Sequence, residues 1–419
     1  MTEFRFIHAA DVHLDSPLLG LEQYEGAPAE QIRGATRQAL KNLVDLAIAE
    51  KAAFVLFAGD LYDGDWRDYN TGLFFSAQMS KLREAGIRAF IAAGNHDAAS
   101  QITKYLRMPD NVKVLSVQEP ESVVLENLGV AIHGQGFPTR AVLSDLSLSY
   151  PAPMRGLFNI GMLHTSVDGR EGHERYAPCT REGLVSKGYE YWALGHVHKR
   201  EILHTDPWII FPGNVQGRHI KETGPKGCTL VAVQDGRVAT AEHRDLDVLR
   251  WSLCEVDASG ADTGEETLNR AVGTLERELK GSDGRALAVR VVIRGACKAH
   301  QEFSVNFDRW TNEIRAAAAD LSGGNIWIEQ VVALTKAEVD PDRVLKRNDT
   351  LSDLLRSVME CNIEGIPPGL VEELKELRRK LPEELRPIAD LENPGPFQEV
   401  IKDVQQILIA RLLRRAEDL

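Results

Sequence analysis

Short apolar runs alternate with stretches of helical periodicity in the first half of the chain. Runs of strand length occur at Phe4–Ala10, Ala52–Ala58 and Ile87–Ala93. Between them, apolar residues recur every three or four positions from Ile32 to Ala47 and around Leu73–Ala85, which predicts helices. Further runs of strand length then follow one another: Val112–Leu115, Val123–Leu125, Val130–His133, Phe158–His164, Tyr189–Gly195, Trp208–Gly213 and Cys228–Val233. This order predicts an α/β layered domain with a mixed sheet over residues 1–245.

A second pattern begins at residue 251. Strand, helix, strand, helix and strand succeed one another across residues 251–335, which predicts a small β-α-β-α-β domain with glycine and serine in its turns. Residues 345–419 are helical and charged in pattern, with apolar faces in Thr350–Met359 and in the stretch that follows Pro396. Such a tail either packs on its own protein or docks on a partner, and the pattern alone does not choose between them.

Length and composition limit the class of protein. The chain has 419 residues, which predicts two or three domains at roughly 100 to 200 residues each. Hydrophobic residues at 43% and charged residues at 26% exclude wholesale disorder, and no apolar run approaches the roughly 18 residues of a membrane span. The first residues lack a signal-peptide pattern, and five scattered cysteines without a C-x-x-C pair favour a reducing compartment. We therefore expect a soluble, cytoplasmic protein.

The net charge of −13 restricts any role in nucleic-acid binding. Proteins that coat nucleic acid usually carry a basic excess, because neutralisation of phosphates supplies much of the affinity. A nucleic-acid role for this chain would therefore rest on a local site, on bound metal cations or on a partner subunit.

Side chains of the kind that bind divalent metal ions follow the ends of five predicted strands. In chain order, these candidate metal ligands are Asp11, His13, Asp60, Asn95, His164, His196 and His198. Because ligands of open α/β sheets sit at the carboxyl ends of the strands, we expect the side chains to meet at one rim. The neighbouring Gly59, Gly94 and Gly195 permit the sharp turns that this placement requires.

The residue types fit two metal ions better than one. Oxygen and imidazole donors without a thiolate suit manganese, iron, zinc or magnesium. Seven ligands exceed the needs of one ion and suit two ions that share a carboxylate, about 3.5–4 Å apart, as in two-metal phosphoesterases. Such a pair polarises a phosphoryl group and activates water. A lone D-x-H or G-H-x-H motif is unspecific, whereas all five elements in this order, each after an apolar strand, form a specific signal.

Other polar residues near this rim have both a structural and a functional interpretation. His8 lies within the first strand, where a core position is favoured over a ligand role. Asp97 is expected either to orient a metal ligand or to cap the helix that follows it. His173, Arg175 and Tyr176 are candidates for substrate contact, with an ordinary exposed loop as the alternative.

A local basic patch lies close to the last motif in the sequence. It consists of Arg218, His219 and Lys221, together with Lys226. These side chains are candidates for contacts with backbone phosphates, and a solvated loop is the alternative.

The motifs together resemble a known group of proteins. D-x-H, G-D-x-x-D, G-N-H-D, a later lone histidine and G-H-x-H are similar to the motifs of the calcineurin-like metallophosphoesterase superfamily. The segments HAADVHLDSPL, HTSVDG, YAPCTREGL, YWALGHVHKRE and FPGNVQGRHIKETGPKG narrow the resemblance to SbcD-type bacterial DNA repair exonucleases, and most closely to their YhaO-like branch. The resemblance is specific over residues 1–245. The small domain stands where the family has a capping domain, and the tail resembles the family only loosely.

This resemblance implies roles for individual residues. For one metal ion the implied ligands are Asp11, His13, Asp60 and His198, and for the other they are Asp60, Asn95, His164 and His196, with Asp60 as the bridge. His96 is implied to reach the scissile phosphate and to stabilise charge or protonate the leaving group. Asp63 is implied to orient His96, although some nuclease relatives carry a histidine in place of Asp63.

The resemblance also implies a reaction, a metal and partners. The reaction is hydrolysis of DNA phosphodiester bonds with manganese, by in-line attack and without a covalent intermediate. The partners are DNA, an SMC-like coiled-coil ATPase of the SbcC type and a second copy of the chain, with residues 345–419 as the candidate docking element. Two other functions stay open: the same metal chemistry on nucleotides or phosphoproteins, and a non-catalytic scaffold for the ATPase. The complete set of ligands counts against the scaffold.

Overall fold

The described part of the chain forms two compact units. The computed structural model describes residues 3–16, 29–63, 69–99, 107–168, 176–338, 344–346, 349–360, 404–405, 407–409 and 412. Unit 1 comprises Met1–Leu253, Leu279–Val289 and Asn325–Glu329, and unit 2 comprises Cys254–Glu278, Arg290–Gly324 and Gln330–Leu419. The domain boundaries at 1–245, 251–335 and 345–419 stay predictions, and most of the tail lies outside the described residues.

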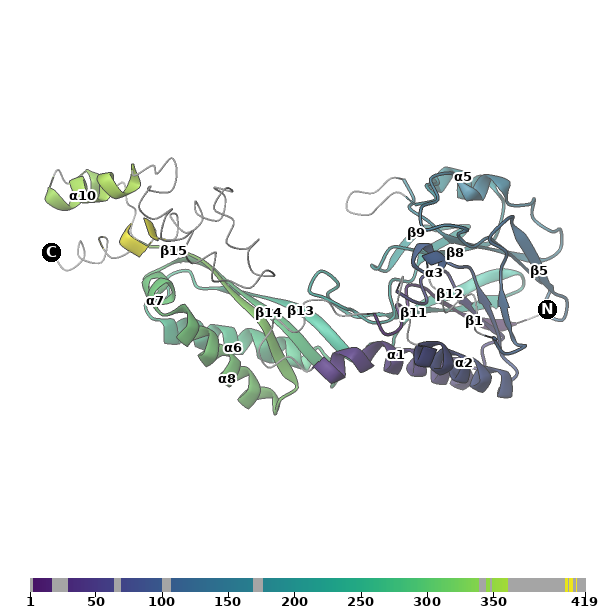
Figure 1. The fold of residues 1–419 in the computed structure, drawn as a ribbon, viewed down its shortest axis with the longest axis horizontal. Helices are drawn as coiled ribbons and strands as arrows, with labels where there is room; N and C mark the ends of the chain where they lie inside the picture. The colour runs from purple at the N-terminus through teal and green to yellow at the C-terminus, as the bar shows by residue number, and fades with distance from the viewer. Residues whose placement is uncertain are drawn as a thin grey trace, which may run out of the picture. The chain divides into compact units, whose positions relative to one another are not determined.

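Unit 1 is built on two six-stranded sheets (Figure 1). The first, in the order β12-β11-β1-β2-β3-β4, contains β1 (Phe4–Ala9), β2 (Phe54–Phe57), β3 (Arg88–Ile91), β4 (Val112–Val114), β11 (Gly227–Gln234) and β12 (Arg237–Asp245). The second, in the order β5-β6-β7-β8-β10-β9, contains β5 (Glu121–Leu125), β6 (Val130–Gly134), β7 (Phe158–His164), β8 (Tyr191–Gly195), β9 (Glu201–Thr205) and β10 (Trp208–Phe211). Strands β1 to β4 are parallel, as are β6, β7, β8 and β10, and the other strands pair antiparallel. The single mixed sheet that the sequence predicts is therefore two mixed sheets.

The parallel strands are apolar on both faces because both faces are covered. In β2, Phe54 and Leu56 pack in the core between the two sheets, and Val55 and Phe57 pack in the core that includes the helices. Those helices are α1 (Ala29–Ala49) and α2 (Tyr69–Glu84), which cover the outer face of the first sheet. A continuous apolar run, rather than an alternating one, is what burial on both faces requires.

Smaller elements complete unit 1. They are α3 (Asn95–Ala99), a 3-10 helix (Leu146–Ser149) and α5 (Arg181–Ser186). The outer face of the second sheet packs against the last two, with Trp192 and Phe211 in contact with the cluster that contains Leu184. No helix within the described residues has the length and hydropathy that a bilayer crossing needs.

A three-stranded sheet follows, in the order β13-β14-β15. Its strands are β13 (Leu249–Asp257), β14 (Ala286–Cys297) and β15 (Ile326–Ala337), and the helices that accompany it are α6 (Gly264–Lys280), α7 (His300–Val305) and α8 (Phe307–Ser322). The two long helices, α6 and α8, bury residues at intervals of four: Thr267, Ala271 and Leu275, and Trp310, Ile314 and Ala318. The predicted β-α-β-α-β order is confirmed, with α7 as an added turn. Helix α10 (Thr350–Met359) follows and begins at a capping box on Asp349.

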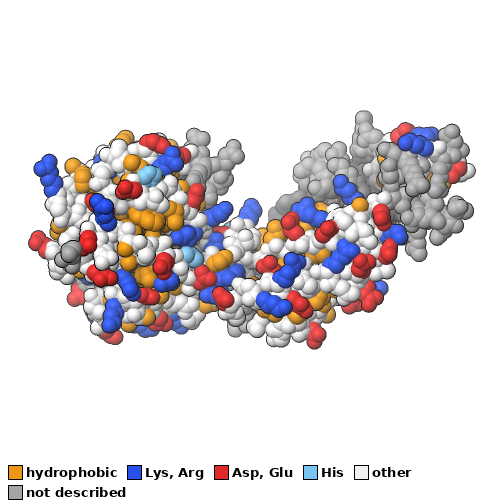
Figure 2. Space-filling model, turned by 180° about the vertical axis from the view of Figure 1, so that it is seen from behind, with side chains coloured by type: hydrophobic (Ala, Val, Ile, Leu, Met, Phe, Trp, Pro, Cys, Tyr) orange, Lys and Arg blue, Asp and Glu red, His pale blue; other side chains and the backbone are white. Residues whose placement is uncertain are grey.

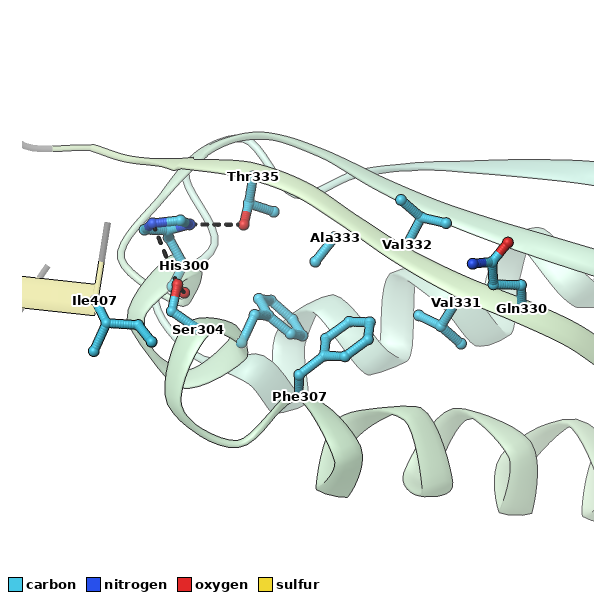
Figure 3. A pocket seen from close by; sticks show the side chains of 10 residues that line it. His300, Ser304, Phe307, Gln330, Val331, Val332, Ala333, Thr335 and Ile407 are labelled. Carbon is cyan, nitrogen blue, oxygen red and sulfur yellow. Dashed lines mark hydrogen bonds between the residues drawn. The ribbon is translucent and has the colours of Figure 1, made fainter. Parts of the chain in front are cut away.

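Unit 2 also holds a pocket of about 470 Å³ beside β15 (Figure 3). His300 donates to or accepts from the Thr335 hydroxyl at 2.9 Å, and Phe303 and Phe307 supply apolar walls. The residues that line this pocket include one histidine and no carboxylate, so the lining does not offer a metal site. The groups of His, Asp and Glu side chains that could hold a metal ion within the described residues lie in unit 1.

Candidate metal centre

The predicted metal ligands come together at the carboxyl ends of strands from both sheets. In the first sheet, β1, β2 and β3 lead into Asp11, His13, Asp60 and Asn95; in the second, β7 and β8 lead into His164, His196 and His198. Three groups have ligand atoms within 4.8 Å of one another: Asp11 with His13 and His198, His13 with Asp60 and His96, and Asp11 with Asp60 and His164. Asp11, His13 and Asp60 each belong to two of these groups, so the role of Asp60 as the bridging carboxylate stays a prediction.

Asn95 and His196 join the same cluster through other contacts. Asn95 Oδ1 lies 2.9 Å from His164 Nε2. The His196 ring packs edge-on to the His164 ring with centroids 5.1 Å apart, and its backbone N–H donates to both carboxylate oxygens of Asp11 at 3.1 and 3.0 Å. All seven predicted ligands are therefore connected by contacts at this rim, and their role as ligands and assignment to individual ions stay predictions.

The backbone is strained where these side chains are presented. Asp11, His13, Asp60 and His196 have positive φ angles of 51°, 45°, 51° and 102°, which L-residues seldom adopt. Such strain persists only where the surrounding structure enforces it, and it is frequent at functional sites. The strand ends are thus bent sharply so that the polar side chains turn toward the rim.

Gly59 leaves room for one of the ligand rings. Its φ is +95°, and a Cβ added there would lie 2.1 Å from His164 Nδ1. We expect Gly59→Ala to displace His164 and to lower the free energy of unfolding by about 1–3 kcal/mol more than Gly86→Ala, an overpacking cost. Gly86 is the matched control, because its φ is +74° and an added Cβ would meet nothing within 4 Å. Thermal unfolding of the metal-free proteins measures this difference; equal losses in the two variants would contradict the close packing.

The contacts of His164 show that the cluster fits a cation. His164 Nδ1 lies 3.0 Å from the carbonyl oxygen of Ala58, which can only accept, so Nδ1 carries the proton. Its Nε2 then faces Asn95 Oδ1 at 2.9 Å and Asp60 Oδ2 at 3.3 Å, so acceptors oppose one another. Acceptors this close require a proton or a metal ion between them. Histidine that donates its second N–H to a protein oxygen is the usual form of a metal-bound imidazole.

The pKa shifts of the side chains in the metal-free site reflect the same crowding. Burial lowers the pKa of His164, but Asp60 outweighs burial and raises that pKa to about 9. Burial raises the pKa of Asp60, and the surrounding histidines, His164 first, hold it well below its ordinary value. Burial, followed by the positive charge of Arg218, lowers the pKa of His13 to about 3. Burial also raises the pKa of Asp11 to about 6. In the metal-free protein a proton on His164 therefore balances the charge of Asp60, and His13 is available as a neutral ligand.

His96 and Asp63 form a pair at the edge of the cluster. His96 Nδ1 lies 2.7 Å from Asp63 Oδ1, and the Ser16 hydroxyl donates to Asp63 Oδ2. The hydrogen bond to Asp63 outweighs burial and raises the pKa of His96. Burial raises the pKa of Asp63, but hydrogen bonds from His13 and His96 outweigh it and hold the pKa well below its usual range. With Nδ1 on Asp63 and 30% of its side chain exposed, His96 can present Nε2 to a bound phosphoryl group.

Three other residues singled out in the sequence are also placed. His8 is fully buried between the sheets, bonded to the Tyr191 hydroxyl and the Leu194 carbonyl oxygen. Asp97 accepts from the backbone N–H groups of Gly94 and Tyr62 at 3.0 Å each, and so fixes the turn that carries Asn95 and His96. The Tyr176 ring packs edge-on to the His196 ring with centroids 5.6 Å apart. His173 and Arg175 lie outside the described residues.

The residues of the predicted basic patch point in different directions. Arg218 turns inward, with Nη1 3.6 Å from Asp63 Oδ2 and Nη2 3.4 Å from Glu222 Oε1. Lys226 is buried and donates to the carbonyl oxygen of His198 at 3.0 Å. His219 and Lys221 are exposed. The side chains therefore do not form one solvated surface, and a phosphate-binding role for Arg218, His219 and Lys221 stays a prediction.

Glu222 is a residue of this site that the sequence did not single out. Its carboxylate is 6% exposed and accepts from His198 Nδ1 at 2.6 Å. Glu222 lies 24 residues after His198, in a turn-rich segment with no periodicity and no motif spacing of its own. Only the return of the chain to the rim between β10 and β11 brings it to the ring.

Comparison with known proteins agrees with this geometry. Residues 4–200 match the calcineurin-like phosphoesterase family, and residues 251–336 match the middle domain of metallophosphoesterase YhaO. The chain is 38% identical to the uncharacterized metallophosphoesterase YhaO of Bacillus subtilis over 299 residues, which cover 70% of this chain and 72% of that protein. The chain belongs to the calcineurin-like metallophosphoesterase family.

This metallophosphoesterase also resembles proteins named for DNA repair. It is 24% identical over 420 residues to the DNA double-strand break repair protein Mre11 of Methanopyrus kandleri, which covers 87% of this chain and 86% of that one. With the Mre11 protein of Sulfurisphaera tokodaii it shares 26% identity over 265 residues, or 59% of this chain and 64% of that one. The family hydrolyses phosphoesters at a dinuclear metal site, and the rim of unit 1 supplies candidate ligands for one.

Proposed function

We propose that this metallophosphoesterase is a two-metal DNA exo/endonuclease subunit of the SbcD/YhaO type that acts in DNA repair. The observation that carries the proposal is the likeness to Mre11 over 87% of this chain, which must extend well beyond the residues matched by the phosphoesterase family. A generic phosphodiesterase would share the metal centre alone. The complete set of rim ligands opposes a non-catalytic scaffold.

The side chains of the rim suggest how the reaction is carried out. Two divalent ions, when bound, supply an activated water and neutralise charge on the phosphoryl group. Asp60 would be a ligand of both ions. His96, fixed through Nδ1 by Asp63, would carry a proton on Nε2 and pass it to the departing oxygen of the substrate. The buried Phe137 ring packs edge-on to the His164 ring. This apolar contact would limit the access of water to the site from the interior of the protein.

The proposal also includes manganese as the metal, an ATPase and a second copy of the chain as partners, and a cytoplasmic location. The donor set of oxygen and imidazole suits manganese. The face in Figure 2 shows acidic and basic side chains interspersed over the described surface, and the chain has a net charge of −13. DNA affinity would therefore depend on the ions and on an SMC-like ATPase, with residues 345–419 as the docking element. Cys179, Cys228 and Cys297 are buried and form no disulfide within the described residues, which fits a reducing location.

Substrate preference tests this proposal against the same chemistry on other phosphoesters. With manganese, we expect linear double-stranded DNA and bis(p-nitrophenyl) phosphate, both diesters, to be hydrolysed, and p-nitrophenyl phosphate to be slower by at least about tenfold in kcat/KM. A preference for the monoester would contradict the nuclease and favour a phosphatase that acts on nucleotides or phosphoproteins.

A further inference from the structure

Glu222 is surrounded by hydrogen-bond donors on both carboxylate oxygens. Oε1 accepts from His198 Nδ1 at 2.6 Å and lies 3.4 Å from both Arg218 Nη2 and His219 Nε2. Oε2 accepts from the Asn214 side-chain amide at 2.9 Å and from the Arg218 backbone N–H at 2.8 Å. A carboxylate is the side chain that satisfies this arrangement, because both of its oxygens only accept.

The bond from His198 determines which ring nitrogen is free. Because Glu222 accepts, the His198 proton is fixed on Nδ1, and Nε2 is left with a lone pair. That Nε2 lies 3.2 Å from His13 Nε2 and 4.0 Å from Asp11 Oδ1, inside the group of Asp11, His13 and His198. Without Glu222, the proton could move to Nε2 and the lone pair would turn away from the cluster.

Glu222 is also connected, through Arg218, to the pair formed by Asp63 and His96. Arg218, whose side chain is 15% exposed, lies between Glu222 and Asp63, and Asp63 holds His96. The carboxylate is thus held in place from two sides, by Arg218 and by Asn214. It is therefore a fixed acceptor for His198.

We propose that Glu222 is a positioning residue that fixes the tautomer and orientation of His198 for one of the two metal ions. This inference rests on the proposed two-metal function and deepens it. The affected ion is the one held by Asp11, His13 and His198. The ion held through Asn95 and His164 has its own orienting group, the Ala58 carbonyl oxygen, and is unaffected.

Metal binding to the full-length protein tests this inference without reference to catalysis. In calorimetric titration with manganese, wild type is expected to bind two ions, and Glu222→Gln and Glu222→Ala are expected to bind one ion normally and the other about 10–100-fold more weakly. In Glu222→Gln one carboxylate oxygen is replaced by an NH₂ group, which is a donor. Whichever way the amide is turned, this NH₂ group faces another donor, either His198 Nδ1 or the Asn214 amide. Glu190→Gln is the matched control, because Glu190 is a carboxylate that accepts from the Asn159 backbone N–H at 2.6 Å, outside the metal cluster.

A double substitution separates positioning from a purely structural role. If Glu222 acts through His198, then Glu222→Gln combined with His198→Gln will weaken manganese binding no further than His198→Gln alone. Additive losses, equal weakening of both ions, or wild-type binding by the Glu222 variants would each overturn the inference. Failure of the wild-type protein to bind two ions would instead overturn the proposed function on which the inference rests.

Discussion

Replacing Asp60 with asparagine is expected to remove the activity of this metallophosphoesterase almost completely. The Asp60 carboxylate lies 3.3 Å from His164 Nε2 and 3.9 Å from His13 Nε2, so it contacts histidines proposed for different ions. An amide has the same shape but lacks the charge and the second acceptor oxygen that two ions share. Loss of several kcal/mol of transition-state stabilisation corresponds to a fall of roughly a thousandfold or more in kcat.

Manganese stoichiometry should fall together with the rate in Asp60→Asn. Wild type is expected to hold two ions per chain and the variant at most one, as counted by equilibrium dialysis. Asp97→Asn is a useful comparison, because Asp97 is also buried beside this turn and accepts from the backbone N–H groups of Tyr62 and Gly94. An Asp60→Asn protein that keeps two ions and wild-type turnover would contradict the bridging role.

The second large effect is expected at His96. Removal of a general acid typically costs about 10²–10⁴-fold in rate, and His96→Ala should show a loss in this range on DNA, whose departing oxygen is strongly basic. With bis(p-nitrophenyl) phosphate, the departing oxygen needs no proton, so the loss should be much smaller. Manganese binding should be unchanged, because the ring is held by Asp63 and lies at the edge of the cluster.

The contrast between the two substrates is the measurement that defines this role. Rates of His96→Ala and wild type are compared on linear DNA and on the p-nitrophenyl diester, in protein of known manganese content. An equal loss on both substrates would contradict proton donation and indicate that His96 stabilises charge on the phosphoryl group instead.

The sequence predicted the ends of the strands that carry the candidate ligands because the apolar runs are unusually clear. Each ligand follows a strand whose two faces are both buried, as in β2 with Phe54 and Val55, so strand ends could be located to within a residue or two. Helix α10 was predicted with the bounds it has, Thr350–Met359, from its apolar face, and in the structure Asp349 caps its first turn. Local patterns of this kind are sufficient wherever burial and capping act within a few residues.

Other features depend on contacts between distant parts of the chain, and the sequence did not predict them. Strands β9 and β12 lie at sheet edges and alternate exposed with half-buried residues, so no apolar run marks them. No local sequence pattern indicates that the strands divide between two sheets. Likewise, the inward turn of Arg218 and the hydrogen bond from His198 to Glu222 arise only when the chain between β10 and β11 returns to the rim. A basic residue in a loop has the same local pattern whether it faces solvent or a buried carboxylate.

The most direct test of the whole account is manganese-dependent release of nucleotides from linear double-stranded DNA by the full-length protein, with the bound metal counted in the same preparation. The account predicts two ions per chain, release of nucleotides, and turnover of the small diester measured alongside. A protein that holds two manganese ions and cleaves neither DNA nor the small diester would contradict it.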